Sequence, residues 1–112
     1  MKISDYVAIF LVTNGIKDLF SISGGGIMHL LDSMAKQEGL NMVYNLNEQA
    51  TGICADSYAQ YTNHLGACLV TTGPGATNAI TGCAGAWLDS SPALFISGQT
   101  KIEQMGQLRG LR

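Results

Sequence analysis

The sequence predicts an α/β fold, a doubly wound parallel sheet with flanking helices. Short apolar runs that suit strands alternate with longer segments of helical periodicity over most of the 112 residues. Glycines follow three of the apolar runs, where a strand must turn into the next segment. Strands that are separated by helices pair in parallel through right-handed crossovers, so this alternation requires helices on both faces of one sheet.

The first half of the chain is expected to form two helices and two strands. Ser4 is expected to cap a helix that ends before Gly15. One face of this helix carries four residues at helical spacing, Tyr6, Ile9, Phe10 and Thr13. A strand over 18–22 then leads into glycines 24–26. The second helix ends at Gly39, and its expected inner face consists of Ile27, Leu30, Leu31 and Met34.

The second half repeats the alternation. A strand over 40–45 precedes a helix from Glu48 to about Tyr61. Small residues recur along this helix and favour its burial, namely Ala50, Gly52, Ala55, Ser57 and Ala59. A third strand over 65–71, a turn over 72–75, a helix over 76–90 and a fourth strand over 93–97 complete the series.

The composition restricts the possible functions. Charged residues make up 12% of the chain, about half of the ~25% found in typical soluble domains. A surface so poor in charge suggests burial against other domains or a second copy of the chain. The formal net charge of −2 lacks the basic excess that nucleic-acid binding requires, so no nucleic acid is expected as a partner.

Neither a membrane span nor a disulfide framework is expected. The longest apolar run covers residues 7–12, whereas a helix needs ~20 residues to cross a bilayer. The three cysteines, Cys54, Cys68 and Cys83, cannot all pair within the chain, and no metal-ligand spacing is present. We therefore expect reduced thiols, a cytoplasmic location, no membrane association and no metal ligand in this chain.

Ligands of doubly wound sheets bind beyond the carboxyl ends of the strands. Glycines 24–26 fall at such an end and fit either a tight turn or a close backbone approach to a ligand. They do not complete a G-x-G-x-x-G pattern, because His29 occupies the third glycine position. Glu48 falls at the next end. It is either a carboxylate favoured by the start of a helix or an acid that shares a proton with a ring nitrogen.

The segment 71–78 is the most specific stretch of the sequence. Pro74 fixes one φ angle, whereas Gly73 and Gly75 reach conformations that other residues rarely adopt. A rigid loop of this kind presents backbone groups to a ligand, and the alternative is an ordinary turn.

Taken together, these segments resemble a known family. After glycines 24–26 the chain carries, in order, N-E-Q-A at 47–50, A-D-S-Y-A at 55–59, L-V-T-T-G-P-G-A-T-N at 69–78 and I-S-G-Q at 96–99. The series is similar to the N-terminal pyrimidine-binding domain of thiamine-diphosphate-dependent enzymes, and the acetolactate synthase-like branch is the nearest in pattern. The resemblance extends over about residues 6–99.

The resemblance implies a role for each candidate site residue. Glu48 would be the catalytic residue and would hydrogen-bond the aminopyrimidine ring of thiamine diphosphate. The other cofactor-binding residues would be Thr72, Gly73, Pro74 and Asn78. Gly25 and Gly26 would face the substrate.

By the same resemblance, the complete enzyme would decarboxylate a 2-oxo acid such as pyruvate and ligate the two-carbon fragment to an acceptor. It would work as a homodimer or tetramer. Mg²⁺ and the diphosphate would be bound by a domain absent from this chain, because no Gly-Asp-Gly signature occurs here, and a requirement for FAD stays open. Residues 1–112 would be the N-terminal part of a truncated pyrimidine-binding domain, inactive on its own.

The chain departs from the family pattern at Ser23, where proline is usual, and at Asn47, where histidine is frequent. Two other functions stay open. One is a thiamine-diphosphate-dependent 2-oxo acid decarboxylase or sugar-metabolism lyase. The other is a non-catalytic fragment that docks on a partner.

Overall fold

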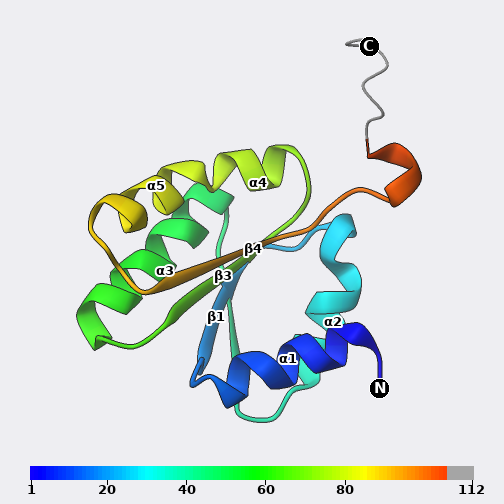
Figure 1. Cartoon of the computed structure of the whole chain (residues 1–112), viewed down its shortest axis with the longest axis horizontal. Helices are drawn as coiled ribbons and strands as arrows, with labels where there is room; N and C mark the ends of the chain where they lie inside the picture. Colours follow the sequence, from blue (N-terminus) through cyan, green and yellow to red (C-terminus); the bar gives the residue numbers. More distant parts are fainter. Residues whose placement is uncertain (106–112) are drawn as a thin grey trace.

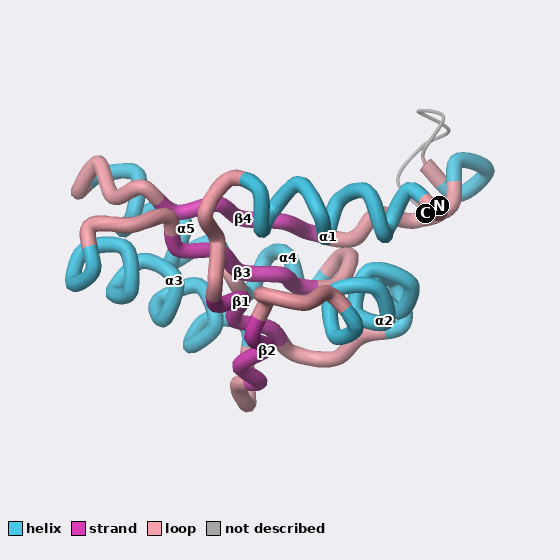
Figure 2. The backbone as a smooth tube through the Cα atoms, turned by 90° about the horizontal axis from the view of Figure 1, so that it is seen from below, coloured by secondary structure: helices cyan, strands magenta, loops and turns pink. Residues whose placement is uncertain are grey.

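The computed structural model describes residues 1–105, and within them it forms one four-stranded sheet. The strands are β1 (Asp18–Ser21), β2 (Asn41–Tyr44), β3 (Gly66–Val70) and β4 (Ala93–Ser97), in the order β2-β1-β3-β4. All three pairings are parallel. In the register, Phe20 lies opposite Val43 on one side and Cys68 on the other. Figure 2 shows the four strands side by side in this order.

Helices cover both faces of the sheet, as the α/β prediction requires (Figure 1). Helices α1 (Ile3–Thr13) and α2 (Met28–Lys36) pack together on one face. Helices α3 (Glu48–Thr62), α4 (Pro74–Asn78) and α5 (Ile80–Leu88) lie on the other. Two short 3-10 helices, η1 (Gly25–Ile27) and η2 (Ile102–Gln104), complete the described elements. The predicted fold class is confirmed.

The main hydrophobic core lies between the sheet and the α1–α2 pair. Strand β3 is buried along its whole length, as expected of a central strand that helices cover on both faces. The core cluster consists of Ala8, Leu11, Ile16, Leu19, Ile27, Met34, Leu40, Ala67 and Leu69. The expected inner face of the second helix is also confirmed, because Ile27 and Met34 are buried and Leu30 and Leu31 pack against this cluster.

Small residues allow α3 to approach its neighbours closely. A Cβ added to Gly82 of α5 would lie 2.6 Å from the carbonyl carbon of Gly52 of α3. A Cβ added to Gly66 of β3 would overlap the carbonyl oxygen of Ala55. Ala55 and Ala59 are buried, so the prediction of a buried small-residue helix is confirmed for this face of α3.

Helix α1 differs from the prediction in its cap and in its buried face. The helix begins at Ile3, and the Asp5 carboxylate accepts a hydrogen bond from the Lys2 backbone N–H at 2.9 Å. Ser4 therefore lies within the helix instead of capping it. The buried residues are Ser4, Ala8 and Leu11, whereas the predicted face of Tyr6, Ile9, Phe10 and Thr13 is exposed. This helix is apolar nearly all round, so periodicity alone did not select the correct face.

The predicted single helix over 76–90 is two helices that meet at Ala79. Ala79 is only 3% exposed, and its carbonyl oxygen would lie 3.3 Å from a Cβ on Gly52. The Ala79 N–H bonds the Ala76 carbonyl, three residues back, which marks a tightened turn. Packing of Ala79 against α3 explains this break. None of the helices within residues 1–105 has the length and apolar character of a membrane span.

Candidate functional site

Glu48 occupies the first position of α3, directly beyond the carboxyl end of β2. The preceding residue, Asn47, fixes this helix start, because its side-chain oxygen accepts the Ala50 backbone N–H at 2.8 Å. Glu48 is therefore held at the edge of the sheet where ligands of this fold bind. Its side chain is half-buried in the described part of the chain.

A side-chain hydrogen bond joins Glu48 to Asn78, which is 30 residues away in sequence. The Asn78 amide Nδ2 donates to Glu48 Oε2 at 2.7 Å. Within residues 1–105, the second oxygen, Oε1, accepts no hydrogen bond. Glu48 also forms no ion pair there, because the ion pair of this region joins Lys36 to Asp32 on α2. Glu48 thus has one oxygen fixed by a neutral donor and one oxygen available to a ligand.

Glycines surround Thr71 and Thr72, the two residues that follow β3. A Cβ on Gly75 would lie 2.5 Å from Thr71 Cγ2 and 3.6 Å from Glu48 Oε1. A Cβ on Gly26 would lie 2.3 Å from Thr72 Cγ2. Gly24 and Gly98 also lie close to these threonines. A Cβ on Gly24 would be too close to Thr71, and one on Gly98 would be crowded by Thr72. The loops after β1, β3 and β4 therefore meet at one place beside Glu48.

The remaining predicted site residues lie on the open side of this cluster. Gly73 has a φ of +58°, and Pro74 begins α4 directly after it; both are exposed. Within residues 1–105 and apart from the adjacent residues in the chain, no heavy atom lies within 4 Å of a Cβ placed on Gly73 or on Gly25. Beside Gly25 is a hollow of about 350 Å³, lined by Ser23, Gly24, Gly25, Met28 and Leu31.

The structure thus brings the predicted residues into two neighbouring groups. Glu48 and Asn78 contact each other, and Thr72 packs against Gly26, whereas Gly25 lines the separate hollow. Thr71 and Gly98 belong to the segments at 71–78 and 96–99 that the sequence places at this edge, but sequence reasoning gave neither of them a role in the site. The structure shows that both pack against the glycines and threonines there. Among residues 1–105, no cluster of three or more metal-binding side chains is present.

This arrangement suits a flat nitrogen heterocycle. A carboxyl group can exchange a proton with a ring nitrogen, and glycine backbone leaves room for a ring to approach without side-chain clashes. Residues 1–110 match the model described as "Thiamine pyrophosphate enzyme, N-terminal TPP binding domain". The chain belongs to this family of thiamine pyrophosphate enzymes.

Among its relatives are acetolactate synthase large subunits. The chain is 42% identical over 96 residues to that of Buchnera aphidicola subsp. Schizaphis graminum, a match that covers 86% of this chain and 17% of the relative. It is 39% identical over 103 residues to the isozyme 3 large subunit of Escherichia coli strain K12, covering 92% of this chain and 18% of the relative. The thiamine pyrophosphate-binding chain therefore spans less than a fifth of these relatives.

Proposed function

We propose that this chain is the pyrimidine-binding portion of an acetolactate synthase-like enzyme that depends on thiamine diphosphate. The enzyme decarboxylates a 2-oxo acid such as pyruvate and ligates the two-carbon fragment to an acceptor. The observation that carries the proposal is the Glu48 carboxyl, which has one free oxygen beside the glycine-lined edge of the sheet. The similarity to acetolactate synthase large subunits supports the same reaction class.

The residues at this edge fit the aminopyrimidine part of the cofactor. Glu48 offers Oε1 to a ring nitrogen. Gly73 has open space where a side chain would stand, and Pro74 fixes the backbone next to it. Asn78 contacts Glu48 from the end of α4, and Thr72, in the loop after β3, packs against Gly26. These five residues would form the pyrimidine site, to which Asn78 belongs through its bond to Glu48.

Thiamine diphosphate, when bound, supplies a nucleophilic carbon for the 2-oxo acid and an electron sink for its decarboxylation. The protein contributes proton control and exclusion of water. Oε1 of Glu48 is the oxygen that can share a proton with the ring, because Oε2 already accepts the Asn78 amide. Gly25 and its neighbouring hollow face the same edge and receive the 2-oxo acid.

The other end of the cofactor requires residues outside the described site. We propose that the diphosphate and Mg²⁺ are bound by a separate domain, as in an enzyme several times longer than this chain. The match to less than a fifth of each relative supports this arrangement. FAD, if the enzyme uses it, is bound by those further parts as well.

The test uses the protein in its native assembly, with thiamine diphosphate, Mg²⁺ and pyruvate. We expect acetolactate to form, and we expect Glu48→Gln to abolish this product and to slow the exchange of the cofactor's C2 proton with D₂O to a small residual rate. Release of CO₂ without a ligated product would assign a decarboxylase instead. Failure of the cofactor to bind or to raise the melting temperature would leave only the non-catalytic docking function.

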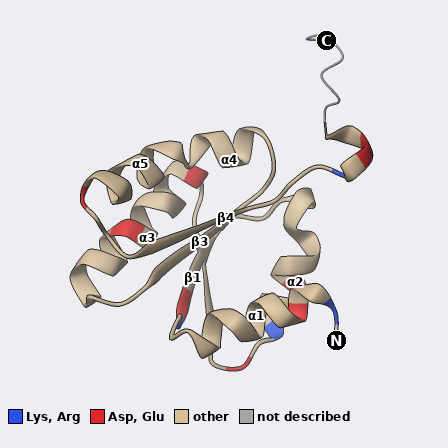
Figure 3. Cartoon of the chain, viewed as in Figure 1, with Lys and Arg blue, Asp and Glu red and all other residues tan. Residues whose placement is uncertain are grey.

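We also propose that the chain assembles as a homodimer or a higher oligomer. Helices α4 and α5 contain no charged residue, and charge is sparse over the whole ribbon (Figure 3). On α5, Ile80, Trp87 and Leu88 are 57%, 84% and 81% exposed. An apolar helix face of this kind is typical of an interface, and a second copy of the chain would cover it.

A cytoplasmic location is part of the proposal. It is supported by the cysteines, since Cys54, Cys68 and Cys83 are all unpaired. Burial raises the pKa of the Cys68 thiol to about 12, so this thiol stays protonated and unreactive at neutral pH.

A further inference from the structure

Asn78 is in a position to control which oxygen of Glu48 carries a proton. Its amide Nδ2 lies 2.7 Å from Glu48 Oε2, and Oε1 has no partner within residues 1–105. An ionised carboxylate only accepts hydrogen bonds, so the NH₂ end of the Asn78 amide must face it. The two oxygens of one carboxyl group are therefore chemically different before any ligand binds.

The packing of α4 and α5 on α3 places Asn78 within hydrogen-bonding distance of Glu48. Asn78 is the last residue of α4 and precedes Ala79, which is 3% exposed. The Ala79 carbonyl packs against Gly52, one helical turn beyond Glu48 on α3. Any shift of Asn78 away from Glu48 would have to displace this contact.

The hydrogen bond between Asn78 and Glu48 is expected to contribute little to folding stability, because both residues are accessible to solvent in the described chain. The bond instead restricts rotation of the carboxyl group. Protonation of Oε2 would make it a hydroxyl oxygen, which is a weaker acceptor for the Asn78 amide than a carbonyl or carboxylate oxygen. The bond therefore favours a proton on Oε1, the oxygen that approaches the glycine edge at Gly75.

We propose that Asn78 is a positioning residue that acts through Glu48: it anchors Oε2 and thereby directs the exchangeable proton of Glu48 to Oε1. This inference rests on the function proposed above for Glu48. It differs from direct cofactor binding by Asn78, because it assigns the effect to the carboxyl group instead of to a contact with the ring.

The first test needs no activity. In the chain without cofactor, the two side-chain amide protons of Asn78 are followed by NMR exchange with solvent. We expect Glu48→Ala to speed their exchange severalfold, because the acceptor is lost. Thr81→Ala is the matched control, since Thr81 is the second residue of α5, is exposed and makes no side-chain hydrogen bond in the described structure. Equal exchange in the parent chain and in Glu48→Ala would contradict the bond.

The second test is a double-mutant cycle on C2 proton exchange in the native assembly with thiamine diphosphate and Mg²⁺. Asn78→Ala should slow exchange about 10- to 100-fold, the range for one hydrogen bond to a charged group, while cofactor affinity changes little. In the Glu48→Gln background, Asn78→Ala should have no further effect on exchange. Additive effects, or weaker cofactor binding alone, would show that Asn78 acts on the cofactor directly.

The cycle also separates the two proposals. If Glu48→Gln leaves exchange unchanged, the proposed function of Glu48 fails. If Glu48→Gln slows exchange to its residual rate while Asn78→Ala has no effect in the parent enzyme, only the role of Asn78 fails. Asn78→Asp is a useful third variant, because it places a second carboxylate against Oε2, and exchange should slow more than in Asn78→Ala.

Discussion

Individual glycines shape the candidate site more than its polar residues do. Gly75 is buried directly beneath Thr71 and close to Glu48 Oε1, so any side chain there would displace one or the other. Gly25 is one loop away and has open space around its Cα. The two positions look alike in the sequence, since each belongs to a glycine-rich turn after a strand. Only their surroundings in the fold distinguish them.

Gly75→Ala is therefore expected to destabilise the chain, whereas Gly25→Ala is not. The Cβ of the first variant would lie 2.5 Å from Thr71 Cγ2, and overpacking of this kind costs about 1–3 kcal/mol. In the described part of the chain, the Cβ of the second variant meets no heavy atom within 4 Å other than those of the adjacent residues. Urea unfolding followed by circular dichroism measures both. A loss of stability that is equal in the two variants would contradict the packing described for Thr71.

At the scale of elements, helix contacts depend on the smallest residues available. Gly52 and Gly82 allow α3 and α5 to touch backbone to backbone, and Ala79 extends this contact to the end of α4. This contact places Asn78 beside Glu48, so the packing of α5 on α3 determines the geometry of the site.

Two glycines of α5 provide a matched pair of substitutions. The Cβ of Gly82→Ala would lie 2.6 Å from the Gly52 carbonyl carbon. This variant should push α3 and α5 apart and lower the free energy of unfolding by about 1–3 kcal/mol. Gly85→Ala has only Asp56 Oδ2 at 3.7 Å and should gain up to about 1 kcal/mol from helix propensity. Thermal and urea unfolding test the pair. Opposite signs are expected, and destabilisation by both would contradict this reading of α5.

A polar contact holds α1 against α2 and should make their packing sensitive to acid. Ser33 Oγ donates to Asp5 Oδ1 at 2.7 Å, and this bond, with the Lys2 backbone N–H, lowers the pKa of the Asp5 carboxyl. A lowered folded-state pKa contributes stability above the unfolded pKa of about 4, and this stability is lost as pH falls through the folded value.

Asp5→Asn should therefore lose less stability than the parent chain between about pH 4 and pH 2. Urea midpoints measured at intervals of pH give both curves. Ser33→Ala keeps the carboxyl but removes its largest stabilising partner, so its acid sensitivity should also fall. Parallel curves for all three proteins would show that this contact is not coupled to unfolding.

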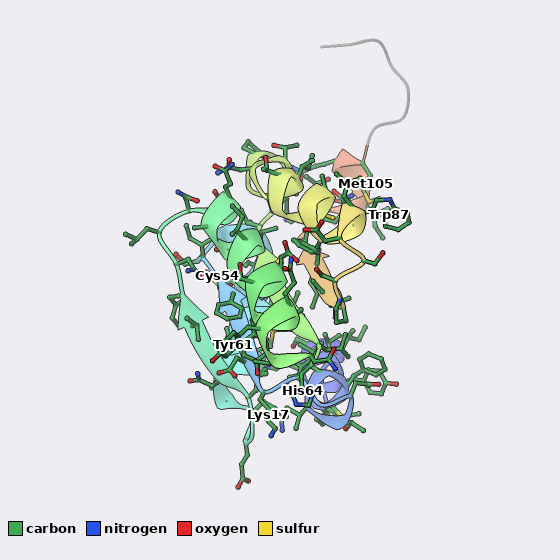
Figure 4. The ribbon with its side chains drawn as sticks, turned by 90° about the vertical axis from the view of Figure 1, so that its left-hand side faces the viewer. Lys17, Cys54, Tyr61, His64, Trp87 and Met105 are labelled. Atoms are coloured by element: carbon green, nitrogen blue, oxygen red, sulfur yellow. The ribbon has the colours of Figure 1, made fainter. Side chains whose placement is uncertain are left out.

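At the scale of the whole molecule, the described chain leaves much apolar surface uncovered. Figure 4 shows the Trp87 side chain projecting outward from α5. Tyr61 is 94% exposed, and the outward face of α1 adds Tyr6 and Phe10, at 57% and 51%. Surfaces of this kind on a chain with 12% charged residues indicate contacts that the chain does not satisfy by itself.

Trp87 is the one tryptophan of the sequence and reports assembly through α5 directly. As protein concentration rises, we expect its fluorescence to shift to shorter wavelength together with an increase in sedimentation coefficient. Leu88→Glu should abolish both changes, because it places a charge on the proposed interface. Tyr6→Glu, on α1 at the opposite face of the sheet from α5, is the control and should leave them intact. Assembly that survives Leu88→Glu would place the interface elsewhere.

The sequence by itself determined the succession of strands and helices along the chain, the fold class and the edge of the sheet at which the candidate site lies. It could do so because periodicity, glycines and caps act locally, as the Asn47 cap of α3 does. Family resemblance added the roles expected of Glu48 and the loop at 72–78, and these roles stay predictions.

Only the tertiary structure decided the buried face of α1, the break at Ala79 and the bond between Glu48 and Asn78. Helix α1 is apolar nearly all round, and its inward face was selected by contact with Ser33 and the core. The bond joins residues that are 30 positions apart, and no local pattern encodes that distance. It exists because glycines at 52 and 82 let two helices pack closely enough to bring α4 beside the start of α3.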